Sequence, residues 1–115
     1  MWSGMQSGTL VLSVRAMAAR GMIMRRIVTE PEFAALRQGG VGLIYNDFSR
    51  HTPSGQQYNV LHIASCPSLK RANLNVDKYF SPDLPRAIAW LRQNRGPENV
   101  NWKRCDMCRG WIPYA

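Results

Sequence analysis

The first regular alternation of apolar and polar residues begins near residue 29 and has the spacing of a helix. Thr29 and Glu32 stand three apart, as in the capping box that satisfies the free N–H groups at a helix N-terminus. Phe33 and Leu36 then fall on one face, because residues three apart are neighbours on a helix surface. Two glycines follow, and glycine commonly ends a helix. The pattern predicts a short helix over residues 30–38.

The next two segments are rich in residues that favour strands. Residues 41–49 (VGLIYNDFS) and 57–63 (QYNVLHI) flank residues 50–56, which have the Pro, Ser and Gly content of a turn. This arrangement predicts an antiparallel β-hairpin, although a loop of this length does not fix the strand register. A further extended stretch is expected within residues 73–80.

A second helix is predicted after residue 80. We expect Ser81 to cap its N-terminus and Pro82 to occupy the first helical position, where the missing N–H group is not needed. The Gly-Pro pair at residues 96–97 ends the segment. Its expected buried stripe consists of Leu84, Ala87, Ile88 and Leu91. The arginines expected on its solvated surface are Arg86, Arg92 and Arg95.

These elements predict an α+β fold, with an antiparallel hairpin and two short helices in one small domain. A chain of 115 residues can form one core, which a bound metal would help to stabilise. We expect the domain to span residues 25–115. Residues 1–24 hold five of the six methionines, which suggests a disordered or wrongly assigned N-terminal tail with a true start at Met22 or Met24, or else an Arg-rich targeting peptide.

The net charge of +8 is unevenly distributed. Residues 66–115 contain nine basic and four acidic residues, so this part of the chain carries +5. Such a balance permits contact with nucleic-acid phosphates, although small proteins that bind nothing acidic often share it. The apolar run Leu10-Val11-Leu12 is far too short to span a bilayer, so no membrane association is expected.

The chain contains three cysteines, and an odd number argues against a disulfide framework. It suits a reducing compartment, and we expect a cytoplasmic protein. Cys105 and Cys108 form a CxxC motif, whose two thiolates can bind one ion in a tight turn. The same motif can be a redox dithiol, but a thioredoxin-like site precedes a long helix, whereas this one follows a helix and a loop.

A structural zinc ion needs four ligands, and the chain offers a second pair upstream. His62 stands four residues before Cys66, at the end of a predicted strand. Cys₃His is a standard closed zinc site, and thiolates with imidazole select Zn²⁺ over Mg²⁺ or Ca²⁺. Alternatively, His62 is a strand histidine bonded to backbone, and His51 is a competing but more isolated histidine. The expected zinc ligands are His62, Cys66, Cys105 and Cys108.

The motifs HIASCP (62–67) and KRCDMC (103–108), with an Asn-rich aromatic segment and a short helix between them, resemble the metal-binding domain of the Ada DNA-repair protein. The resemblance covers roughly residues 57–110. It implies the zinc scaffold and a DNA-facing surface. In that family the first cysteine of CxxxC accepts a methyl group from a DNA phosphotriester. The matching residue here is His62, whose neutral imidazole cannot replace a thiolate, so no methyl transfer is expected.

The basic residues that flank the ligands suggest a nucleic-acid-binding module. They would gather around the zinc and contact phosphates with little sequence preference. Trp102 and Trp111 are expected either to stack on bases or to pack in the core. The residues expected to contact nucleic acid are Lys70, Arg71, Lys103, Arg104 and Arg109.

Two other classes of function fit parts of the sequence. The first is a zinc-stabilised protein-interaction domain or accessory subunit, in which the basic charge serves solubility. The second is an enzyme, which is less favoured because the sequence has no paired carboxylates at a useful spacing, no Ser-His-Asp set and no phosphate-cradling glycine loop. Asp47 with His51 is the nearest approach to a hydrolytic pair, and its spacing matches no known motif.

Overall fold

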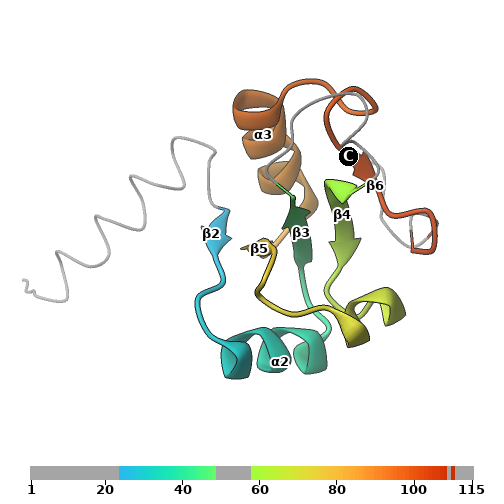
Figure 1. Cartoon of the computed structure of the whole chain (residues 1–115). Coiled ribbons are helices and arrows are strands. Elements are labelled where there is room, and N and C mark those ends of the chain that lie inside the picture. Colours follow the sequence, from blue (N-terminus) through green and yellow to red (C-terminus); the bar gives the residue numbers. More distant parts are fainter. Residues whose placement is uncertain (1–23, 49–57, 109, 111–115) are drawn as a thin grey trace, which may run out of the picture.

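The computed structural model describes residues 24–48, 58–108 and 110, which form a five-stranded sheet and two α-helices (Figure 1). The expected α+β fold is therefore confirmed. No helix in these residues is long and apolar enough to cross a bilayer. The predictions about residues 1–24 lie outside the described residues, apart from Met24. The elements are β2 (Arg25–Arg26), α2 (Glu30–Gly39), β3 (Leu43–Asp47), β4 (Val60–Ile63), the 3₁₀ helix η2 (Pro67–Arg71), β5 (Asp77–Ser81), α3 (Leu84–Arg95) and β6 (Lys103–Arg104).

The predicted hairpin is present and forms the middle of the sheet, whose strand order is β2-β5-β3-β4-β6. Leu43 pairs with Ile63 and Asn46 with Val60, so the paired strands are shorter than the sequence pattern indicated. The other edge of β3 pairs antiparallel with β5, whereas β6 runs parallel to β4. The pattern predicted neither β2 nor β6, because two residues are too few to show a periodicity.

Helix α2 begins and ends as its sequence predicts. The side chain of Thr29 accepts a hydrogen bond from the backbone N–H of Glu32 at 3.2 Å. At the other end Gly40 adopts a φ of +68° and donates its N–H to the carbonyl of Leu36. Phe33 is fully buried and anchors the helix to the sheet.

Helix α3 begins later than predicted. Its N-cap is Asp83, whose carboxylate accepts the N–H of Arg86 at 2.9 Å. Ser81 is instead the last residue of β5, and its hydroxyl donates to the carbonyl of Asp83. The prediction of Ser81 as the cap was wrong because Asp83 is an equally good capping residue and Pro85 supplies the early proline. The predicted stripe is confirmed as buried: Leu84, Ala87, Ile88 and Leu91.

The two helices contact opposite faces of the sheet. On one face Trp90 of α3 packs against Tyr45 and Tyr79, with ring centroids 6.4 and 5.0 Å apart. On the other face Phe33 of α2 lies 5.7 Å from the Nζ of the buried Lys78. Because side chains alternate along a strand and His62 pairs with a neighbour of Tyr45, His62 points to the face opposite α3.

Arg95 does not lie free on the solvated surface, as the sequence pattern had indicated. Its guanidinium binds the carboxylate of Asp47 through two hydrogen bonds of 2.8 and 3.2 Å. The Asp47 side chain is 4% exposed and that of Arg95 16%. This ion pair links the C-terminal end of α3 to the C-terminal end of β3. The guanidinium of Arg95 also lies over the ring of Trp90.

We predict that Arg95→Ala lowers the free energy of unfolding by about 3 kcal/mol, because it leaves the buried carboxylate of Asp47 without its cation. Urea denaturation followed by circular dichroism measures this change. The matched control is Arg92→Ala, an exposed arginine on the same helix that should change stability by less than about 0.5 kcal/mol. Equal effects of the two substitutions would contradict the structural role of this ion pair.

Candidate metal centre

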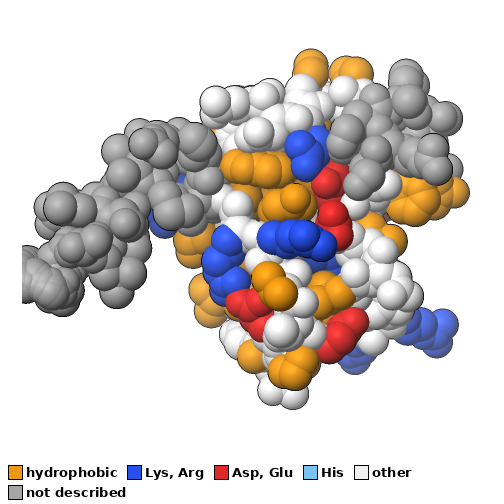
Figure 2. All heavy atoms as spheres, turned by 60° about the vertical axis from the view of Figure 1, so that its left-hand side comes forward, with side chains coloured by type: hydrophobic (Ala, Val, Ile, Leu, Met, Phe, Trp, Pro, Cys, Tyr) orange, Lys and Arg blue, Asp and Glu red, His pale blue; other side chains and the backbone are white. Residues whose placement is uncertain are grey.

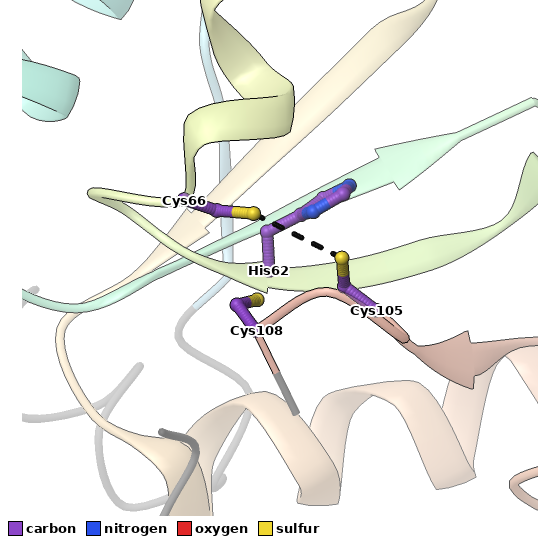
Figure 3. Close-up of side chains that lie close together, drawn as sticks. All are labelled: His62, Cys66, Cys105 and Cys108. Carbon is purple, nitrogen blue, oxygen red and sulfur yellow. Dashed lines mark hydrogen bonds between the residues drawn. The ribbon is translucent and has the colours of Figure 1, made fainter. Parts of the chain in front are cut away.

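The structure brings the four predicted ligands together. One ligand atom from each of four residues lies within 4.8 Å of the other three, and all four residues are buried (Figure 3). These residues are His62, Cys66, Cys105 and Cys108. In Figure 3 the side chain of Cys66 comes from one side and those of Cys105 and Cys108 from the other, with the imidazole ring of His62 beside them. The sulfur atoms of Cys66 and Cys105 lie 3.8 Å apart. Two segments that are about forty residues apart in the sequence therefore form one compact group.

The first pair of donors is positioned by β4 and the turn that follows it. His62 is the third residue of β4. After the strand, Ala64 donates its N–H to the carbonyl of Gly42, and Cys66 donates its N–H to that of Ile63. This turn directs Cys66 back toward His62, as the HxxxC spacing predicted. The 3₁₀ helix η2 starts immediately afterwards with Pro67.

The second pair of donors is positioned by β6. The backbone N–H of Lys103 donates to the carbonyl of Asn59, and that of Cys105 donates to Leu61, both at 2.9 Å. These bonds extend the parallel pairing with β4 up to the first cysteine of CxxC. The turn then places Cys108 where its sulfur accepts the N–H of Ile63 at 3.4 Å. Backbone contacts with β4 thus fix both halves of the group.

Burial and mutual repulsion control the protonation of these side chains. Burial lowers the pKa of His62 to about 4, with a smaller effect from the charge of Lys78, so the imidazole is neutral and can donate a lone pair. Burial, offset in part by the N–H of Ile63, raises the pKa of Cys108 to about 12, and the charges of Cys105 and Cys66 add to the increase. A cation placed among the thiolates would remove this repulsion.

The thiol of Cys105 differs from that of Cys108. Burial raises its pKa, but hydrogen bonds from the backbone N–H groups of Cys108 and Met107 and from the side chains of Cys108 and Cys66 together hold the pKa below its ordinary value. Such N–H groups stabilise a thiolate in the tight turn of a CxxC motif. The donor set is therefore soft, buried and supported by the backbone, and it could hold a metal ion.

Ser68 completes the surroundings of the group and was not predicted from the sequence. Its Oγ lies 3.0 Å from the sulfur of Cys66, 3.2 Å from Nδ1 of His62 and 4.0 Å from the sulfur of Cys105. One hydroxyl thus contacts three of the four donor residues. The only sequence signal was its position two residues after Cys66, in the turn that opens with Pro67.

The basic residues predicted to surround the metal have different environments. Lys103 pairs with Asp106 at 2.8 Å, and Arg104 pairs with Glu98 at 2.9 Å. Lys70 and Arg71, at the end of η2, are exposed and make no ion pair with a described residue. The remaining residue, Arg109, lies outside the described residues.

Of the two tryptophans predicted either to stack on bases or to pack in the core, the structure describes only Trp102. Its ring is fully buried, and its Nε1 donates to the carbonyl of Gly96 at 2.8 Å, so Trp102 belongs to the core and does not offer a face to a base. Trp111 and the competing ligand His51 lie outside the described residues.

Comparison with known proteins gives no match: no protein-family model, no curated protein and no solved structure matches this chain. The buried His/Cys₃ group is therefore the structural basis for assigning a function.

We predict that Ser68→Ala weakens metal binding by the group about 10- to 100-fold, the usual cost of losing a residue that orients metal ligands. Competition with a chromophoric zinc chelator measures the affinity of the full chain. Ser68→Thr keeps the hydroxyl and should restore most of the affinity.

The matched control is Ser65→Ala, an exposed serine in the same turn that contacts none of the donor atoms in the described structure. It should leave metal affinity unchanged. If Ser68→Ala and Ser65→Ala behave alike, Ser68 does not position the ligands.

Proposed function

We propose that this protein is a small zinc-stabilised binding module that contacts nucleic-acid phosphates through basic residues beside the zinc site. The observation that carries the proposal is the buried His/Cys₃ group, whose donor atoms already lie close together. In this proposal the domain has an Ada-like zinc scaffold, spans residues 25–115, acts in the cytoplasm and does not accept methyl groups.

Zinc is the metal that the donor chemistry favours. Three thiolates and one imidazole form a standard tetrahedral structural site, whereas Mg²⁺ and Ca²⁺ prefer oxygen ligands. All four donors come from this chain, so a bound ion would have no position left for a catalytic water. The ion would close a loop of about forty residues between Cys66 and Cys105, and closing a long loop favours the folded state in a small domain.

The histidine at position 62 argues against methyl transfer. Three thiolates with Zn²⁺ give a net charge of about −1, whereas a four-thiolate site carries about −2 and holds more nucleophilic sulfur. The position that resembles the methyl-accepting cysteine is the one that lacks sulfur here. We therefore propose that the scaffold serves binding alone.

The distribution of charge favours Lys70 and Arg71 as the first phosphate contacts. On the face shown in Figure 2, basic side chains lie directly beside acidic ones, and the structure has such pairs between Arg26 and Asp77 and between Arg25 and Glu32. Lys70 and Arg71 have no such partner among the described residues. Lys103 and Arg104 would first have to exchange a carboxylate for a phosphate.

A second function has one observation in its favour. Phe48 and Tyr58 are 40% and 50% exposed at the loop end of the hairpin, with ring centroids 5.0 Å apart. An exposed aromatic pair is typical of protein-binding surfaces as well as of base-stacking ones. The alternative proposal is therefore a zinc-stabilised protein-interaction or accessory subunit that does not bind nucleic acid.

We predict that the purified full chain contains about one zinc ion and that its removal by a strong chelator at neutral pH unfolds the C-terminal half. Elemental analysis and circular dichroism measure the two effects. His62→Ala should abolish stoichiometric zinc, whereas His51→Ala should retain it. Protein without zinc, together with a circular dichroism spectrum that the chelator does not change, would refute the zinc proposal.

We predict salt-dependent binding to duplex DNA or RNA. The logarithm of affinity should fall with the logarithm of salt concentration, with a slope of about −0.9 for each phosphate contact on B-DNA. The double variant Lys70→Gln/Arg71→Gln should make the slope shallower by about 2. Fluorescence anisotropy over a salt series measures it.

The matched control is Arg86→Gln/Arg92→Gln, which removes the same charge from α3 on the opposite face of the sheet. Equal losses in the two double variants would show that only net charge matters. No binding even at low salt would exclude the nucleic-acid function. A protein partner recovered by affinity capture after nuclease treatment would then support the accessory-subunit alternative.

A further inference from the structure

A small cavity lies between the last turn of α2 and the turn that carries Cys66. Its volume is about 200 Å³. Arg37 and Gln38 line it from α2, and Ser65, Cys66 and Lys70 line it from the segment after β4. Pockets for drug-sized ligands usually measure about 300–1,000 Å³, so this one suits a single small chemical group.

Of the described residues that line this cavity, two are cationic and none is acidic. Arg37 and Lys70 come from separate elements and make no ion pair in the part of the chain that the structure describes. Cys66 also lines the cavity, and a zinc-bound Cys₃His group would carry about −1. The two cations exceed that charge, so the cavity remains favourable to an anion.

An aromatic ring holds the guanidinium of Arg37 in place, and its Nε atom lacks a hydrogen-bond acceptor in the described structure. Its guanidinium carbon lies 4.6 Å from the centroid of the Phe33 ring, which is fully buried and fixes the side chain. The Nε atom of Arg37 is buried and has no hydrogen-bond partner among the described residues. Buried N–H groups are nearly always paired in folded proteins, so this orphan donor indicates a missing acceptor.

We propose that this cavity binds a phosphate group, with Arg37 and Lys70 contacting its oxygens. Arginine presents several N–H donors in a rigid planar array that suits phosphate oxygens, and lysine adds a compact charge. The phosphate comes from a nucleic-acid backbone or from a small phosphate ester, which share this chemistry. If the phosphate belongs to a nucleic acid, this inference rests on the proposed function. The binding of phosphate itself does not depend on that function.

The test is a titration of the zinc-loaded full chain with inorganic phosphate at constant ionic strength, followed by ¹⁵N NMR. Saturable shifts are expected for the backbone amides of Gln38 and Ser65. Arg37→Gln and Lys70→Gln should each weaken binding at least about 10-fold, whereas Arg92→Gln should leave it unchanged. Because Lys70 is exposed, Lys70→Gln should fold normally. It therefore tests the proposal even if Arg37→Gln does not fold.

A second arm with duplex DNA separates this inference from the proposed function. Phosphate binding without duplex binding would support the cavity, assign it to a small phosphate ester and refute the nucleic-acid function. Duplex binding that Arg37→Gln does not weaken, with no saturable phosphate shifts, would overturn the cavity proposal alone. Shifts of equal size in the Arg92→Gln and Arg37→Gln proteins would also overturn it.

Discussion

The short parallel pairing of β6 with β4 is the contact on which the rest of the structure depends. It consists of only a few backbone hydrogen bonds, yet it brings the second half of the metal group to the first. Two strands of this length cannot be stable alone, because so few bonds do not offset the entropy of closing the intervening loop. The neighbouring buried Trp102 supplies packing, and a metal ion held by the four donor residues would supply further stabilisation. The fold and the metal group therefore support each other.

The sequence predicted the donor group better than the sheet, and the reason is physical. Three cysteines and a nearby histidine leave few alternatives for a four-ligand site, and their spacing suits two turns. The hairpin and the caps of α2 follow from local chemistry in the same way. The strands β2 and β6 do not, because each has two residues and forms only through contacts with distant segments. Strand order is likewise a property of the whole chain.

The sequence did not predict the ion pairs of its charged side chains, and the prediction of a solvated Arg95 was wrong for that reason. Arg95 has the spacing of a solvated residue, but the carboxylate of Asp47 lies 48 positions away and no local pattern links the two. Arg104 and Lys103 have nearby acids, Glu98 and Asp106, whose pairing with them depends on the turn after α3 and on the CxxC turn. Ser68 reaches the donors only because η2 folds over them. Such contacts need the three-dimensional arrangement before they can be identified.

The metal group and the cavity share Cys66 and the segment that follows it, so they cannot behave independently. Because η2 starts immediately after Cys66, a metal bound to that sulfur would fix the start of the helix and the direction in which Lys70 extends. Arg37 approaches from α2, which supplies none of the four donor residues. A phosphate between Arg37 and Lys70 would then link α2 to the metal-bound segment. Metal binding should therefore favour phosphate binding by reducing the entropy lost when Lys70 is ordered, and the same coupling acts in reverse.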